Sequence, residues 1–153
     1  MSLARRRTMS VRTFPARSRR PQKIFIGLDV GGTSLKVGAV DEDAKQLVDQ
    51  LREFPSGFSD GPLECLRAVS SAVTLVTEEL PQYELAGLGV DYPGPSDRFG
   101  KIRPEGTVNS KNKKWGGFNL AKRLQKLLGV PVAFDNDANA AGRWASEVLY
   151  KGK

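Results

Sequence analysis

The sequence has no histidine, a single cysteine and no long hydrophobic run. Without histidine, Ser-His and Cys-His catalytic pairs are excluded, as are zinc sites with a histidine ligand, and one cysteine cannot replace these ligands. Cys65 can form no internal disulfide, which predicts a reducing compartment, and we expect a cytoplasmic protein. No apolar run approaches the ~20 residues of a membrane-spanning helix, so no membrane partner is expected.

Excess positive charge is confined to the N-terminal segment. The 153 residues include 24 Lys and Arg against 17 Asp and Glu, a net charge of +7. Eight of the basic residues lie in 1–23, which has no acidic residue, so residues 24–153 are close to neutral. We therefore expect no nucleic-acid binding by the folded body. Residues 1–23 are predicted to be a basic, disordered tail; an organelle transit peptide and an arm that binds a phosphate polymer or nucleic acid are the alternatives.

Hydrophobic periodicity predicts an α/β fold for residues 24–153. Strands are predicted at 24–30, 35–39, 46–54, 85–90 and 131–134, the first one buried on both faces. Helices are predicted at 62–80, at 119–128, and after the polar turn 135–139 as far as about 149. Three antiparallel strands followed by helix-separated parallel strands give a mixed sheet with helices on its faces. The 91–95 loop and the irregular 96–118 segment separate the later elements.

The segment 29–36, DVGGTSLK, predicts a metal–phosphate cradle. Gly31 and Gly32 permit a tight turn and leave backbone N–H groups uncovered, which favours an anion site. Thr33 adds a hydroxyl and Lys36 a cation, while Asp29 suits that position if Mg²⁺ lies between it and the anion. The P-loop pattern is absent from the chain. A plain glycine hairpin with Asp29 at the strand edge is the alternative.

A second polar group, DNDAN at 135–139, follows the last predicted strand. One of these side chains is sufficient to cap the following helix, and that role is the structural alternative. The polar side chains beyond the one needed for capping indicate a binding role. A carboxylate at the carboxyl edge of a sheet is well placed as a general base. The 91–95 loop, Asn109 and Trp115 are weaker candidates for sugar contacts, with a rigid turn and a core tryptophan as alternatives.

The motifs DVGGTSLKVGAV, GLGVDYPGP and DNDANAA, in this order and spacing, resemble the N-terminal half of the ROK family of sugar kinases and repressors. The resemblance covers about residues 24–150. It implies a ribonuclease-H-like lobe of the actin/hexokinase superfamily for residues 24–153, with the C-terminal lobe absent. It also implies phosphorylation of a hexose, as in a glucokinase, with ATP and Mg²⁺ as cofactors.

The resemblance also assigns roles to particular positions. It implies a nucleotide-phosphate site formed by Asp29, Gly31, Gly32, Thr33 and Lys36, with Asp29 binding Mg²⁺ through water. It implies a sugar site formed by Gly94, Asn109, Asn136 and Asp137. Asp137 matches the catalytic base that accepts the proton of the sugar hydroxyl.

Two other functions stay open at this point. One is a non-catalytic, sugar-sensing regulator of the repressor branch, although residues 1–23 are too few for the DNA-binding domain of that branch. The other is a glucokinase that uses polyphosphate in place of ATP. The expected partners are the hexose and either the missing C-terminal lobe or a second copy of the chain. A lobe alone is expected to be a truncated or poorly active enzyme.

Overall fold

The structure, a computed structural model, describes residues 21–92, 94–97, 99–103 and 113–136. The elements in these ranges are β1 Gln22–Val30, β2 Ser34–Asp41, β3 Arg52–Pro55, α1 Pro62–Glu79, β4 Tyr83–Tyr92, a 3₁₀ turn at Lys113–Trp115, α2 Leu120–Leu128 and β5 Val132–Asn136. Residues 1–20 and the predicted third helix lie outside the described ranges, so both expectations stay predictions.

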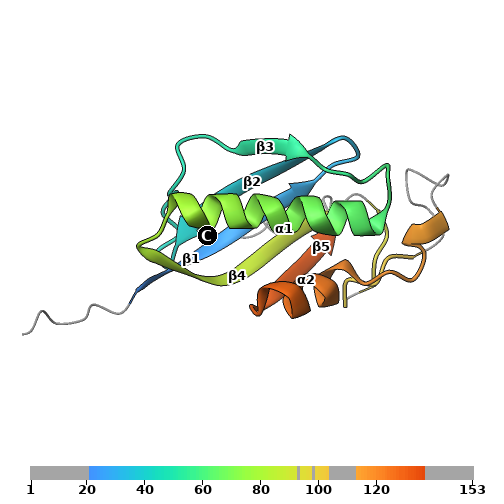
Figure 1. Ribbon diagram of the computed structural model, residues 1–153. Coiled ribbons are helices and arrows are strands. Elements are labelled where there is room, and N and C mark those ends of the chain that lie inside the picture. The colour runs from blue at the N-terminus through green and yellow to red at the C-terminus, as the bar shows by residue number, and fades with distance from the viewer. Residues whose placement is uncertain (1–20, 93, 98, 104–112, 137–153) are drawn as a thin grey trace, which may run out of the picture.

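The strands form one mixed sheet in the order β3-β2-β1-β4-β5 (Figure 1). β1 pairs antiparallel with β2, and β2 pairs antiparallel with β3. β4 lies parallel to β1, and β5 parallel to β4. The antiparallel meander and the parallel later strands confirm the predicted α/β sheet. The carboxyl ends of β1, β4 and β5 consequently meet at one edge of the sheet.

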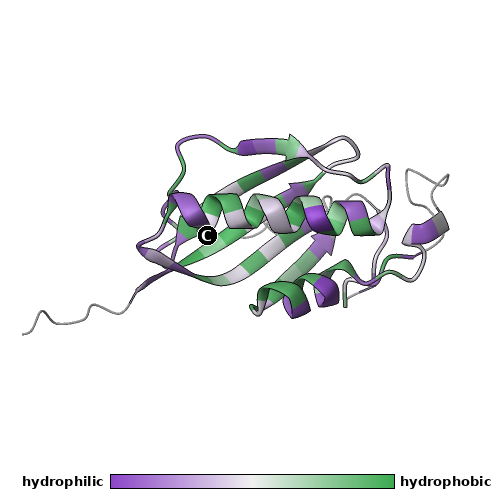
Figure 2. Cartoon of the chain, viewed as in Figure 1, coloured by the Kyte–Doolittle hydropathy of each residue, from purple (hydrophilic) through white to green (hydrophobic). Residues whose placement is uncertain are grey.

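Both helices begin and end at residues that the sequence marks. Pro62 occupies the first turn of α1, where a missing N–H costs nothing. At the start of α2, Asn119 Oδ1 accepts a hydrogen bond from Lys122 N at 2.8 Å, and Gly129 ends the helix in the left-handed conformation at φ 72°. Hydrophilic and hydrophobic residues alternate along both helices, as expected of helices with one buried side (Figure 2).

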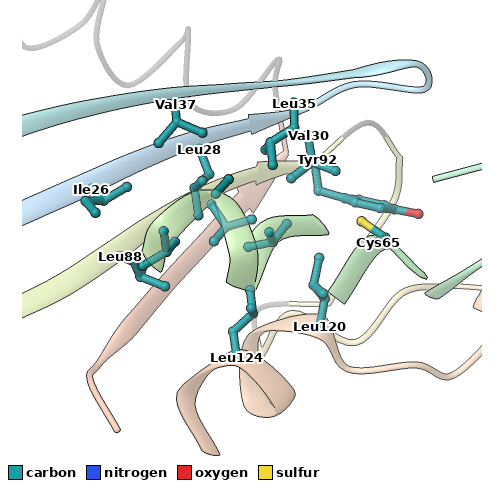
Figure 3. Packing of buried hydrophobic residues seen from close by; sticks show 14 of the residues in the cluster. Ile26, Leu28, Val30, Leu35, Val37, Cys65, Leu88, Tyr92, Leu120 and Leu124 are labelled. Atoms are coloured by element: carbon teal, nitrogen blue, oxygen red, sulfur yellow. The ribbon is translucent and has the colours of Figure 1, made fainter. Parts of the chain in front are cut away.

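The hydrophobic core lies between the sheet and the two helices, which cover the same face. Leu120 and Leu124 of α2 point at the strands (Figure 3). β1 is therefore buried on one face only: Ile26 and Leu28 are at most 3% exposed, whereas Phe25 is 40% exposed. The predicted burial on both faces is wrong for the described chain, because neither α1 nor α2 covers the second face.

Two predicted strands have different bounds in the structure. The third strand is limited to Arg52–Pro55, and Gln46 contributes only an isolated bridge to Val40. β4 continues through Asp91 and Tyr92, which were expected in a loop. The continuation arises because β4 is a central strand: Asp91 pairs with Asp29 on one side and Asp135 on the other.

Trp115 belongs to the core. Its side chain is fully buried, and its Nε1 donates a hydrogen bond to the Phe58 carbonyl at 3.1 Å. Its ring stacks on Phe58 with centroids 4.6 Å apart and also contacts Tyr92. Trp115 is therefore a core tryptophan, as the structural alternative had it, and its indole offers no face to a sugar. No helix in the described ranges is both long and apolar enough to cross a membrane.

Candidate functional site

Four charged side chains lie side by side across the carboxyl edge of the sheet. Strand register places Lys36 of β2 opposite Asp29 of β1, Asp29 beside Asp91 of β4, and Asp91 beside Asp135 of β5. Paired residues of neighbouring strands point to the same face, about 4.8 Å apart. We call these four residues the charged row. It occupies the sheet face that α1 and α2 leave uncovered.

Lys36 and Asp29 form a loose ion pair at the solvent-facing end of the charged row. Lys36 Nζ lies 3.9 Å from Asp29 Oδ2, and the two side chains are 48% and 57% exposed. A pair this exposed contributes at most about 1 kcal/mol to stability, because water screens it. Both groups can therefore turn to a ligand at little cost to the fold.

The turn between β1 and β2 presents uncovered backbone amides. Gly31 N donates to Ser34 O at 2.8 Å and closes the turn. Among the described residues, no acceptor takes the N–H of Gly32 or Thr33. A Cβ on Gly31 would lie 2.9 Å from Ser34 O, whereas a Cβ on Gly32 would have no neighbour within 4 Å. Gly31 is thus required by the turn itself, and Gly32 keeps the approach to the amides open.

Two serines of the loop after β3 support this turn from behind. Ser56 N donates to Thr33 O at 3.1 Å, and Ser59 Oγ donates to Gly32 O at 3.3 Å. Ser56 is fully buried. Ser59 holds the Gly32 carbonyl on the protein side, so the N–H of the same trans peptide unit, that of Thr33, points the opposite way and is left for a ligand. This arrangement fits an anion, as the sequence predicts.

The structure places only part of the predicted sugar site. Gly94 follows the end of β4 with φ 145°, a conformation that residues with a side chain rarely adopt. The backbone of Asn136 ends β5 opposite Tyr92. Gly94 and Asn136 therefore follow adjacent strands at the edge that carries the charged row. Asn109 and Asp137 lie outside the described residues.

Two hollows adjoin the charged row on the sheet face that neither described helix covers. One, of about 730 Å³, has Asp29 and Lys36 at its rim. The other, of about 280 Å³, reaches Asp91 and Asp135. Both have Gly27 and Gly89 in their floor, so the backbone of the sheet is accessible between the two ends of the charged row.

The described residues offer a limited metal site. They contain no group of three or more Asp, Glu or Cys side chains placed to hold a metal ion. Mg²⁺ in phosphate-transfer sites typically keeps several waters and binds one or two carboxylates together with phosphate oxygens. Asp29 beside the uncovered amides fits this kind of site, in which the nucleotide supplies the other ligands.

Sequence reasoning marked the segments that contain Asp91 and Asp135 as candidates but gave neither aspartate a role of its own, and it missed the two supporting serines. A signal for the aspartates exists: each of the three strands that become parallel neighbours carries an Asp at its carboxyl end. The serines have no such signal, because their role depends on the packing of a loop against the turn.

Known proteins share both the sequence pattern and the fold. A family model described as ROK family matches residues 25–152. A glucokinase from Thermotoga maritima is 33% identical over 123 residues, which are 78% of this chain and 35% of the relative. A xylose repressor from Bacillus subtilis is 28% identical over 84% of this chain and 32% of its own length. The chain therefore spans about a third of these curated relatives.

A solved structure resembles the chain over a similar range. The inorganic polyphosphate/ATP-glucomannokinase from Arthrobacter sp. strain KM superposes with a TM-score of 0.66 at 28% identity. The match covers 81% of this chain and 48% of the other. The fold described here therefore resembles about half of that larger protein.

Proposed function

The chain belongs to the ROK family, and we propose that it forms the phosphate-binding lobe of a kinase that phosphorylates a hexose with ATP. One observation carries the proposal. The uncovered amides of Gly32 and Thr33, together with Lys36 and Asp29, lie at the same sheet edge as the end of β5, which leads directly into Asp137. A phosphate donor and a proton acceptor would therefore meet at this edge.

On the donor side, each group has a role that fits its position. The amides of Gly32 and Thr33 would donate to phosphate oxygens, and the Thr33 hydroxyl and Lys36 would add a further donor and a positive charge. Asp29 would hold Mg²⁺ through water. The bound Mg²⁺ would neutralise charge on the phosphates during transfer.

On the acceptor side, Gly94, Asn109 and Asn136 would bind the hexose, and Asp137 would accept the proton of its hydroxyl. Phosphoryl transfer requires mainly positioning and charge neutralisation from the protein. A general base adds about 10²–10⁴-fold to the rate. The lobe would thus contribute one wall of the substrate cleft, and a second lobe the other.

Substitution of Asp137 by asparagine tests the proposal. The chain would be joined to the second lobe of a related glucokinase, and hexose-dependent ADP formation measured. Asparagine caps a helix about as well as aspartate but cannot accept the proton, so we expect kcat to fall about 10²–10⁴-fold while hexose affinity survives. Asp43→Asn, in the exposed turn after β2, serves as the control. An unchanged kcat for Asp137→Asn would refute the assignment of the base.

A second phosphate donor is supported by one observation, the similarity to a glucomannokinase named for both polyphosphate and ATP. The same joined protein would be supplied with polyphosphate in place of ATP. Faster hexose phosphorylation with polyphosphate would assign that donor. The similarity to the xylose repressor supports the regulatory alternative, for which sugar binding without transfer from either donor is the expected result.

A further inference from the structure

The loop between β3 and α1, residues 56–61, connects the amide-bearing turn to the aromatic core. We call it the support loop, and it lies at the sheet edge that carries the turn (Figure 1). Ser56 N donates to Thr33 O at 3.1 Å, and Ser59 Oγ donates to Gly32 O at 3.3 Å. The plane of the Gly32–Thr33 peptide, and with it the direction of the Thr33 N–H, therefore depends on the support loop.

Trp115 holds the support loop through a buried hydrogen bond. Its Nε1 donates to Phe58 O at 3.1 Å, the two rings stack with centroids 4.6 Å apart, and both side chains are at most 2% exposed. Phe58 N in turn donates to Ser56 Oγ at 3.3 Å. Loss of the indole N–H would leave the buried Phe58 carbonyl without this donor, which is costly. The backbone of the support loop is therefore fixed while Trp115 is in place.

The first turn of α1 confines the support loop as well. Gly57 has φ 61°, and a Cβ at this position would lie 3.0 Å from the carbonyl of Glu64 and 3.2 Å from Cys65 N. The helix thus leaves the loop no room to shift toward it. The position of the loop relative to the amide-bearing turn then depends on the contact with Trp115.

Tyr92 belongs to the same aromatic cluster and provides a contrast. Its ring centroid lies 5.5 Å from that of Phe58 and 5.6 Å from that of Trp115. Its hydroxyl is buried and has no hydrogen-bond partner in the part of the chain that the structure describes. The polar contact between the cluster and the support loop is therefore the indole N–H of Trp115.

We propose that Trp115 is a positioning residue for the phosphate donor. The inference rests on the proposed kinase function. Because its indole is fully buried, Trp115 acts through Phe58 and the support loop. The loop holds the carbonyls of the turn and so keeps the Thr33 N–H directed at the phosphate.

Two variants at opposite ends of this connection test the proposal. Trp115→Phe keeps an aromatic ring but removes the N–H, and Ser59→Ala removes the hydroxyl that holds Gly32 O. Each folded 153-residue chain would be titrated with ATP and Mg²⁺ well below its melting temperature, and the shifts of the turn amides followed by NMR. We expect the dissociation constant to rise about two- to tenfold in each variant, the range for one neutral hydrogen bond. Tyr92→Phe, which removes a hydroxyl from the same cluster, is the matched control and should leave the affinity unchanged.

A double variant shows whether both changes act through the support loop. If they do, Trp115→Phe combined with Ser59→Ala should weaken ATP binding by less than the product of the two single effects, whereas independent changes would multiply. In the protein joined to a second lobe, Trp115→Phe should raise the KM for ATP and leave the KM for the hexose unchanged. A general loss of stability would not produce this difference between the two substrates.

The unmodified chain supplies a measurement that needs no folded Trp115 variant. The indole N–H signal of Trp115, distinguished from that of the second tryptophan by Trp144→Phe, should shift as ATP with Mg²⁺ binds at the turn. An indole signal that stays constant while the turn amides respond would refute the role of Trp115, and so would an equal loss of affinity in Tyr92→Phe. Both results would leave the phosphate site in place. Turn amides that do not respond to ATP with Mg²⁺ in the unmodified chain would instead remove the phosphate site, and the role of Trp115 with it.

Discussion

Gly31 and Gly32 are adjacent, yet the structure predicts opposite consequences when each is replaced by alanine. A Cβ on Gly31 would lie 2.9 Å from Ser34 O, the acceptor of the 2.8 Å hydrogen bond that closes the turn. The added methyl group must therefore displace backbone and weaken that hydrogen bond. A Cβ on Gly32 would meet no atom within 4 Å, so the fold can accept it.

The magnitudes follow from these contacts. Overpacking against a fixed backbone atom costs about 1–3 kcal/mol, which is the expected loss of unfolding free energy for Gly31→Ala. Gly32→Ala should leave stability unchanged or raise it by about 0.4–1 kcal/mol, because alanine restricts the unfolded chain. In the same variant, a methyl group would stand beside the amides proposed to bind phosphate. Loss of one hydrogen bond to a charged group, about 1.5–3 kcal/mol, predicts an affinity for ATP with Mg²⁺ that is lower by about 10- to 100-fold.

Urea unfolding measures the first effect, and titration of the turn amides by NMR measures the second. The two variants control for each other, since both add one methyl group to the same turn. If Gly32→Ala destabilised the chain as much as Gly31→Ala, the described turn geometry would be wrong. If Gly32→Ala were stable and bound ATP like the unmodified chain, the amides would not be the phosphate site.

Two further predictions concern titrating groups. Burial raises the pKa of the Cys65 thiol to about 12, above its unfolded value of about 8.5. The stability that the neutral thiol contributes is therefore complete below pH 8.5 and is lost as pH rises toward 12. Unfolding free energy should fall between pH 8.5 and 10, and Cys65→Ala should reduce this slope; an equal slope would contradict the argument. Hydrogen bonds from the Lys101 and Phe99 amides lower the pKa of the Asp97 carboxyl. The contribution of the Asp97 carboxylate to stability is therefore present above the unfolded pKa of about 3.9 and is lost as pH falls through the folded value. NMR titration of the Asp97 carboxyl should give a midpoint below 3.9, and a midpoint at or above 3.9 would contradict the hydrogen-bonded turn.

The sequence was informative where local rules decide the structure. Asn119 and Gly129 mark the ends of α2 correctly because capping depends on a few neighbouring atoms. The alternation of buried and more exposed residues in β2 and the proline at the start of α1 are likewise local features. The apolar spacing of α2 includes Leu127, yet this residue is 56% exposed, because α2 is short and only part of its apolar side meets the sheet.

Features that depend on pairing between distant segments could not be predicted in the same way. The apolar run of β1 does not reveal whether a second layer covers its other face. The loop expected at Asp91 is strand because β1 and β5 hydrogen-bond to either side of β4. The phosphate cradle was predicted from its residue types, whereas the serines that bond to the carbonyls of its turn became visible only in the fold.

The composition of the charged row leads to a final prediction about the metal. The charged row holds three carboxylates, Asp29, Asp91 and Asp135, and one ammonium group, Lys36. Charges about 4.8 Å apart interact by about 1–3.5 kcal/mol for effective dielectric constants between 80 and 20. A nucleotide phosphate near Asp29 is therefore repelled unless a divalent cation accompanies it.

Asp29→Asn should accordingly have opposite effects under two conditions. Without Mg²⁺, removing the negative charge should strengthen ATP binding to the chain; with Mg²⁺, it should weaken binding, because the carboxylate that holds the hydrated ion is lost. Isothermal titration with ATP, in the presence of EDTA and then of Mg²⁺, measures both values, and Asp43→Asn should change neither. A variant that bound ATP more weakly under both conditions would show that Asp29 supports the turn and does not hold the metal.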